Sequence, residues 1–436
     1  MKAKPGYKLV TNFFKKEIEI PDNWDYLKFN QVVKINPLTK IDEDYVPYIP
    51  MDAVDTKKPN LKYFEERKLS ENSSLSKFQE NDVLFARITP STENGKTCLI
   101  KNFKRKGIVS SELTVLRPSD KVLPIYLYYY VKNHRLRQFA ISQMMGSTGR
   151  QRVPDYVFKR DLDFDLPPLK EQEKIAFILS NIENLIDLYD KEITQTKSLK
   201  QSLIQQLLTT GIDHEEFKTI QFLPRHLSVN IPSEWKSDIL ENTLKRKPQN
   251  GITKKLDMYG SGVPIVEIDS LCKSDFFVDD TSLRNIQLND DEIKNYSLMT
   301  DDFLINRVSK VRGGSGLIAL IKNPKKFEVF EGNIIRFSLD EKIILPEFFE
   351  FFSKTFLYNN YIQSTCKTTT LTSLDQDIIF KIPILIPSLN EQKKIIEILS
   401  NITSNIIDLE SKKLYLENLK KGLMQNLLTG KMRVKI

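Results

Sequence analysis

The stretch EQEKIAFILSNIENLIDL (Glu171–Leu188) decides the fold, because nearly the same residues return later in the chain as EQKKIIEILSNITSNIIDL (Glu391–Leu409). In both copies aliphatic residues recur every seven positions, which is typical of a long amphipathic helix with a coiled-coil seam. Pro168 and Pro387 stand just before the two copies, where helices commonly begin. The sequence therefore predicts the same long helix twice.

Each predicted helix is about 40 residues long and would span roughly 60 Å. The main seam, which we predict to be the core of a helix pair, consists of Ile175, Ile182, Leu203, Ile395, Ile402, Leu409, Leu416 and Leu423. A second seam, interrupted by polar residues, consists of Ile178, Leu185, Leu199, Ile398 and Leu419. Two such helices in one chain most naturally pair with each other, antiparallel about a pseudo-two-fold axis. The alternative is that each helix packs only on its own domain.

The repeat extends beyond the helices, so it describes the whole chain. IPDNW (Ile20–Trp24) returns as IPSEW (Ile231–Trp235), and NDVLFAR (Asn81–Arg87) returns as DDFLINR (Asp301–Arg307). Runs of β-branched and aromatic residues between these landmarks predict strands, and later runs predict helices. The predicted fold is α+β: two tandem mixed α/β domains, 1–168 and 212–387, each followed by a long helix, 169–211 and 388–436. Gene duplication without functional meaning is the alternative explanation of the repeat.

Composition narrows the class of protein. The formal net charge is +8, which suits a polyanionic partner without proving one. The three cysteines and three histidines show no metal-ligand spacing, so we expect no bound metal and a reducing compartment. The N-terminal residues lack the apolar run of a signal peptide, and no membrane-spanning segment follows. We therefore expect a cytoplasmic protein.

These landmarks resemble, along the whole chain, the specificity (S) subunit of type I restriction–modification systems. The resemblance rests on the two IPxxW openings, on LPPLKEQEKIAFILSNIENLID and IPSLNEQKKIIEILSNITSNIID, and on the helix exits LLTTGIDHEEFK and LLTGKMRV. It implies two target-recognition domains, each reading half of a bipartite site on double-stranded DNA. The helix pair would set the gap between the halves.

The resemblance also implies partners. The helices would dock two methyltransferase (M) subunits and, through them, two restriction (R) subunits. The S chain would be a non-catalytic subunit of a restriction endonuclease and adenine methyltransferase complex, without a cofactor of its own, while its partners use S-adenosylmethionine, ATP and Mg²⁺. Because the two domains differ in sequence between their landmarks, we expect an asymmetric site.

Motifs for catalysis or nucleotide binding are incomplete. PSTENGKT (Pro90–Thr97) ends like a P-loop, but that motif requires glycine at the position of Pro90. RGGSG (Arg312–Gly316) precedes a predicted strand rather than a helix, which argues against a dinucleotide site. The only Pro-Pro pair, Pro167–Pro168, lies between leucines and lacks the context of an adenine methyltransferase motif.

Candidate DNA contacts are polar residues in loops at equivalent places of the two repeats, where side chains can reach phosphates and base edges. In the first repeat they are Arg87, Thr89, Ser91, Asn94, Lys96, Ser147, Thr148, Arg150, Gln151 and Arg152. In the second they are Arg307, Ser309, Lys310, Arg312, Ser315, Lys367, Thr368, Thr369 and Thr370. For any single residue the alternative is a solvated surface position.

Three other functions stay open on the sequence alone. An independent nuclease or NTPase lacks a P-loop, a metal cluster and a convincing set of acidic residues. A coiled-coil adaptor would use its globular domains to bind proteins instead of DNA. An orphan specificity subunit would serve methylation only, without R.

Overall fold

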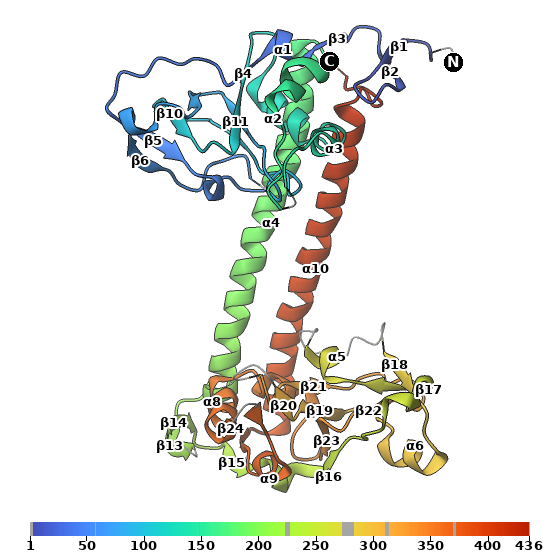
Figure 1. Ribbon diagram of the computed structural model, residues 1–436. Coiled ribbons are helices and arrows are strands. Elements are labelled where there is room, and N and C mark those ends of the chain that lie inside the picture. Colours follow the sequence, from blue (N-terminus) through green and yellow to red (C-terminus); the bar gives the residue numbers. More distant parts are fainter. Residues whose placement is uncertain are drawn as a thin grey trace. The chain divides into compact units, whose positions relative to one another are not determined.

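The computed structural model describes residues 3–56, 58–147, 149–222, 227–272, 283–309, 314–368 and 372–435. Two compact units make up the chain: a first unit, Met1–Lys191 with Glu410–Ile436, and a second unit, Glu192–Leu409 (Figure 1). The long helices α4 (Leu169–Thr210) and α10 (Leu389–Leu427) each contribute one part to each unit. The four predicted segment boundaries stay a prediction. Within the described parts of the chain, none of the helices combines the length and apolar character needed to cross a membrane.

The first unit opens with a hairpin and then builds two four-stranded sheets. The hairpin pairs β1 (Tyr7–Thr11) with β2 (Glu17–Pro21). One sheet has the order β4-β11-β8-β9: Val33–Ile35, Leu113–Pro118, Val83–Ala86 and Thr97–Leu99. The other has the order β6-β5-β10-β7: Glu65–Lys68, Tyr45–Ile49, Gly107–Val109 and Lys77–Phe78. A short pair joins β3 (Asp25–Lys28) to β12 (Asp163–Leu166), just before α4 begins.

The second unit repeats this plan. A hairpin of β13 (Phe217–Phe222) and β14 (Leu227–Pro232) follows α4. The sheet β16-β23-β19-β21 consists of Leu244–Asn250, Ile334–Leu339, Asp302–Asn306 and Ile318–Leu320. The sheet β18-β17-β22 consists of Arg284–Ile286, Tyr259–Val266 and Val329–Phe330. The pair β15 (Lys236–Ile239) and β26 (Pro383–Ile386) precedes α10, as β3 and β12 precede α4.

Helices cover the sheets in both units, and their ends follow from local residues. The first unit has α1 (Phe29–Val32), α2 (Pro124–Lys132), α3 (His134–Ser142) and the π-helical turn η3 (Val157–Asp161); the second has α5 (Ile268–Cys272), α6 (Asp290–Tyr296), α7 (Pro346–Phe352), α8 (Phe356–Thr365) and α9 (Gln376–Phe380). The sequence predicts one helical run over 124–144 and another over 346–364. Both are divided, because Asn133 and Thr355 cap a new helix by accepting a backbone N–H with their side chains.

A glutamate and the glutamine after it, near the start of each long helix, fasten that helix to its domain. Glu171 accepts a hydrogen bond from the indole N–H of Trp24 at 3.0 Å, and Glu391 accepts one from Trp235 at 2.9 Å. The neighbouring Gln172 and Gln392 each bond three backbone groups of the domain. A side chain from the exit of the opposite helix completes each cluster: the Arg433 guanidinium contacts Glu171 at 2.8 Å, and the His214 ring contacts Glu391 at 2.7 Å.

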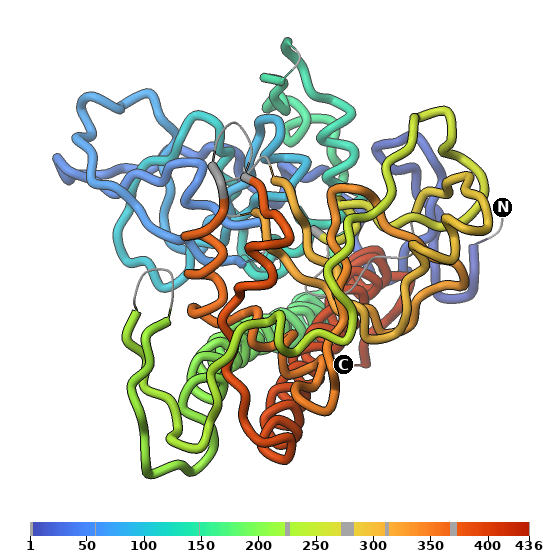
Figure 2. The backbone as a smooth tube through the Cα atoms, turned by 90° about the horizontal axis from the view of Figure 1, so that it is seen from below, coloured from blue at the N-terminus to red at the C-terminus, as the bar shows by residue number. Residues whose placement is uncertain are grey.

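Within each unit the segments of α4 and α10 lie side by side and run antiparallel (Figures 1 and 2). In the first unit Asp190 pairs with Lys413 and Glu183 with Lys420, so residue numbers rise along one helix as they fall along the other. Of the predicted core, Ile175, Ile182, Ile395 and Leu409 are buried, while Leu203, Ile402, Leu416 and Leu423 are half-buried. Of the second seam, Leu185, Leu199, Ile398 and Leu419 are exposed.

Candidate nucleic-acid interface

In the first unit the structure brings the two predicted polar loops together. Ile88 forms an antiparallel bridge with Arg152. The Thr89 N–H donates to the Gln151 carbonyl at 3.0 Å, and the Val153 N–H donates to the Arg87 carbonyl at 2.8 Å. Residues 87–96 and the described residues of 145–152 therefore form one composite surface, although the two segments are far apart in the sequence.

The second unit builds the same arrangement. Strand β20 (Val308–Ser309) pairs with β25 (Thr372–Ser373), which pairs in turn with β24 (Lys367–Thr368). The Leu374 N–H donates to the Arg307 carbonyl at 2.9 Å, just as Val153 does to Arg87. The backbone N–H groups of Arg87 and Arg307 also match: the first donates to the Glu112 carbonyl at 2.9 Å, and the second to the Asn333 carbonyl at 2.8 Å. Two repeats with different side chains thus present paired loops on one backbone plan.

Several predicted contacts in the first unit are tied to the protein itself. The Arg87 guanidinium pairs with Asp155 at 2.9 Å, and Arg152 donates to both oxygens of Glu112 at 2.8 and 2.6 Å. The hydrogen bonds from Arg152 hold the pKa of Glu112 below its usual value. The Thr89 hydroxyl donates to Glu93 at 2.8 Å, and the Lys96 ammonium donates to the Met51 carbonyl at 3.1 Å. These side chains shape the loops.

Other side chains of the first surface are open to solvent. Asn94, Ser147 and Arg150 are exposed, and Ser91 and Gln151 are half-buried. Gly95, which looks like a P-loop glycine in the sequence, is a turn residue at φ +71° whose N–H donates to the Thr92 carbonyl at 3.0 Å. Exposed amide and guanidinium groups on a backbone fixed by long-range pairing are suited to contact a nucleic acid.

In the second unit Arg307 and Ser309 are half-buried, and Ser315 is buried. The Arg307 Nε donates to the Leu374 carbonyl at 3.2 Å, and Asn306 donates to the Gly314 carbonyl at 2.6 Å. Lys367 and Thr368 are placed by their backbone in β24. Thr148, Lys310, Arg312, Thr369 and Thr370 lie outside the described residues.

Sequence reasoning missed the carboxylates that organise the first surface. Asp155 and Glu112 hold two of the predicted arginines, and Asp155 also accepts from the Asn36 side chain at 3.4 Å. No local pattern marks either residue, because each partner comes from another segment. The only usable signal was that both repeats place an arginine at the end of a buried strand.

Comparisons with known proteins fit this geometry. The family model described as "Type I restriction modification DNA specificity domain" matches residues 21–198 and 238–418, one match per repeat. Two proteins of Methanocaldococcus jannaschii are similar over nearly their whole lengths. The type I restriction enzyme MjaVIII specificity subunit is 25% identical over 98% of this chain and 99% of its own. The putative MjaX specificity subunit is 28% identical over 97% of each chain.

Solved structures share the fold. A chain from a study of complex assembly and conformational transition in the type I R-M system aligns with a TM-score of 0.61 at 15% identity. The alignment covers 95% of this chain and all of that one. The type I restriction–modification S subunit from M. genitalium aligns with a TM-score of 0.53 at 12% identity, over 98% of this chain and all of its own. With the family model matching both repeats, the chain belongs to the type I restriction–modification specificity subunit family and carries two DNA specificity domains in tandem.

Proposed function

We propose that each unit reads one half of a bipartite DNA site through its pair of loops. The observation that carries this proposal is the repetition of one loop-pairing scheme, Val153 to Arg87 and Leu374 to Arg307, in loops of different sequence. Exposed Arg and Lys suit phosphates or guanine, and Asn and Gln suit adenine. Because the two surfaces differ in sequence, the two half-sites differ and the whole site is asymmetric.

The long helices serve as the docking surface for methyltransferase subunits. Large apolar side chains stand exposed along them: Phe177, Leu185, Leu188 and Leu199 on α4, and Ile407, Leu414, Tyr415 and Leu419 on α10. Exposed apolar residues repeated along a helix are characteristic of an interaction surface. Two M subunits bind here and recruit two R subunits. This chain is non-catalytic, and the partners use S-adenosylmethionine, ATP and Mg²⁺ in the cytoplasm.

The test is the adenine methylation pattern of a methylation-free host that expresses this chain with its neighbouring methyltransferase gene. We expect a gapped, asymmetric motif that disappears when this chain is deleted. A motif that persists without the chain would refute the proposal. Methylation without any R subunit encoded nearby would identify an orphan specificity subunit, and a complex with M that lacks sequence-dependent binding would identify an adaptor.

The exposed Arg150 provides a residue-level prediction. Arg150→Ala should weaken binding of the complex with M to its site by about 5- to 150-fold, because one arginine contact to DNA contributes about 1–3 kcal/mol. Fluorescence anisotropy with the target duplex measures the loss. Lys121→Ala is the matched control, since Lys121 is an exposed cation of the same unit outside both loops. Equal effects of the two variants would remove Arg150 from the interface.

Helix length provides a second prediction. Seven residues inserted after Lys191 in α4 and after Leu409 in α10, where the two units meet in the sequence, add about 10 Å to each helix. The unread gap should lengthen by about three base pairs, because B-DNA rises about 3.4 Å per base pair. Methylation mapping measures both gap and half-sites. A changed half-site sequence, or an unchanged gap, contradicts the role of the helices as a spacer.

A further inference from the structure

The first unit contains a cavity of about 540 Å³ that the DNA proposal does not use. Thr56, residues 58–60, Leu99, residues 101–102, helix α2 and the first-unit segments of α4 and α10 line it. None of the predicted DNA contacts that the structure describes lies in its wall. Its size falls within the range of pockets that bind small molecules.

The cavity wall contains a recessed lysine with an incomplete set of partners. The Lys132 ammonium, at the end of α2, contacts the Tyr128 hydroxyl at 2.8 Å and donates to the Thr56 carbonyl at 3.2 Å. An ammonium has three donors, so one is left by these two contacts. Among the described residues Lys132 forms no ion pair with a carboxylate. A half-buried cation with only neutral partners favours an anion nearby.

In the second repeat the charge of the equivalent lysine is balanced by a carboxylate of the protein itself. Lys354 follows Pro346 of α7 by eight positions, as Lys132 follows Pro124 of α2, and it pairs with Glu350 at 3.4 Å. The residue corresponding to Glu350 is Tyr128, also four positions before the lysine. The first unit therefore keeps the cation but replaces its internal carboxylate with a neutral phenol.

The carboxylates around the cavity are already occupied. Glu183 pairs with Lys420 and accepts from the Tyr129 hydroxyl at 2.7 Å. Asp187 pairs with Lys58, and Asp190 with Lys413. The Lys132 charge is thus left for a ligand to neutralise.

We propose that this cavity binds a small organic anion whose carboxylate or phosphate group is held by Lys132. The apolar side chains of Pro59, Leu99, Ile125 and Ile186 line the same space and suit the body of such a molecule. The site belongs to the first unit alone, because the equivalent lysine of the second unit has its own carboxylate. It does not depend on DNA recognition.

The proton balance at Lys132 provides a second readout. Burial is the main cause that lowers the pKa of Lys132 to about 8; Glu183 and Asp55 oppose this shift, and Lys420 and Arg137 support it. Near pH 8 a fraction of the lysines is therefore neutral. A bound anion favours the charged form, so binding at this pH takes up a proton.

The experiment uses the full chain and inorganic phosphate as the probe for the anionic group. At pH 7 and constant ionic strength, exchanging chloride for a saturating concentration of phosphate should raise the Tm of the wild type by about 3 °C. Lys132→Met should lose this shift and bind phosphate at least tenfold more weakly by isothermal titration. At pH 8, titrations in buffers of different ionisation enthalpy should show proton uptake by the wild type only.

The control removes the corresponding lysine of the second unit together with its carboxylate. Lys354→Met/Glu350→Leu should respond to phosphate as the wild type does. If Lys132→Met fails to fold, Lys132→Arg keeps a cation there and should retain the phosphate shift without the proton uptake. An identical phosphate response of wild type and Lys132→Met, or no response of the wild type, overturns the proposal. Phosphate binding that is unchanged in Arg150→Ala, the variant expected to weaken DNA binding, supports the proposal.

Discussion

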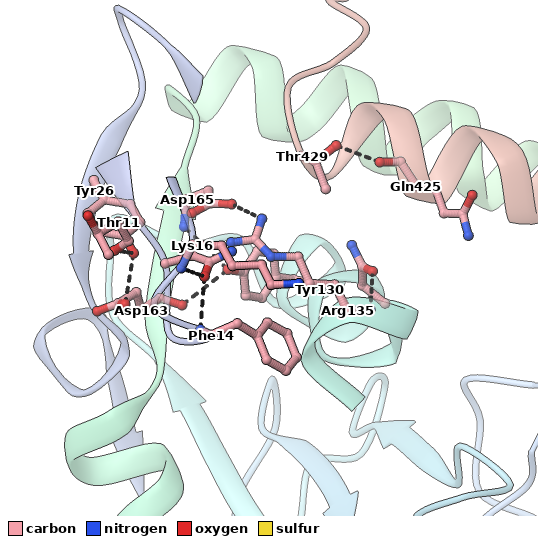
Figure 3. A network of polar contacts seen from close by, with 12 residues as sticks. Thr11, Phe14, Lys16, Tyr26, Tyr130, Arg135, Asp163, Asp165, Gln425 and Thr429 are labelled. Atoms are coloured by element: carbon pink, nitrogen blue, oxygen red, sulfur yellow. Dashed lines mark hydrogen bonds and ion pairs between the residues drawn. The ribbon is translucent and has the colours of Figure 1, made fainter. Parts of the chain in front are cut away.

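Arg135→Leu should lower the free energy of unfolding of the first unit by about 3–5 kcal/mol, whereas Arg135→Leu/Asp165→Leu should fold with nearly wild-type stability. The Arg135 Nη1 donates to Asp165 at 2.8 Å, and the two side chains are 22% and 2% exposed. Figure 3 shows Arg135 of α3 and Asp165 of β12 pointing toward one another. Removing Arg135 alone leaves a buried carboxylate without its cation.

The second unit has leucine at both positions equivalent to this ion pair. Leu357 is the second residue of α8 as Arg135 is of α3, and Leu385 is the third residue of β26 as Asp165 is of β12. Both leucines are buried in the core of the second unit. The same fold therefore forms with an apolar pair in place of the ion pair, which is why the double variant should be tolerated.

The effect of pH on this series has a definite sign. Burial raises the pKa of Asp165, and Arg135 partly offsets it. Without Arg135 that pKa rises further, and a neutral carboxyl is less costly to bury than a charged one. The penalty of Arg135→Leu should therefore be smaller at pH 5 than at pH 8, while the double variant should show no such difference.

The measurement uses the two tryptophans of the chain, one in each unit. In a Trp235→Phe background, urea unfolding followed by Trp24 fluorescence reports on the first unit. The single and double variants are compared with this background at both pH values. A double variant as unstable as the single one would show that the ion pair does more than neutralise Asp165.

The sequence predicts regular elements well where the local pattern is strong. NIIRFSL forms β23, a fully buried strand, and the heptad runs form α4 and α10. The hairpins β1-β2 and β13-β14 were not predicted, because the sequence between the strands of each hairpin contains no Asn-Gly or Asp-Gly pair. Exposure of Leu185 and Leu199 was not foreseen either, since a seven-residue period does not tell which helix face another element covers.

The candidate interface could be predicted only as separate loops. Polar composition and repetition identified candidates within residues 87–96 and 147–152, but the pairing of these loops depends on tertiary contacts such as Val153 to Arg87. The roles of Arg87 and Arg152 depend on Asp155 and Glu112, which come from other segments. Sequence reasoning finds residue types suited to DNA, and the fold decides which of them are occupied.

The largest effect on the joint between domain and helix is expected at two equivalent glutamines. Gln172 accepts from the Leu123 N–H at 2.9 Å and donates to the Lys121 and Pro167 carbonyls at 2.8 and 2.9 Å. Gln392 makes the corresponding bonds to Leu345, Ile343 and Pro387 at 2.8, 3.0 and 3.0 Å. Both side chains are fully buried, so water does not compete for these hydrogen bonds in the wild type.

Gln172→Ala and Gln392→Ala should each lower stability by about 3–5 kcal/mol, because each leaves three backbone groups without a partner. The exposed neighbours provide controls: Glu173→Ala and Lys393→Ala should change stability by less than about 0.5 kcal/mol. Gln172→Ala should shift the unfolding seen by Trp24, and Gln392→Ala that seen by Trp235, each with the other tryptophan replaced by Phe. If either variant shifts both probes equally, the two units unfold as one cooperative body. If each shifts only its own probe, the duplicated joint fastens each domain independently, and a damaged half leaves the other half folded.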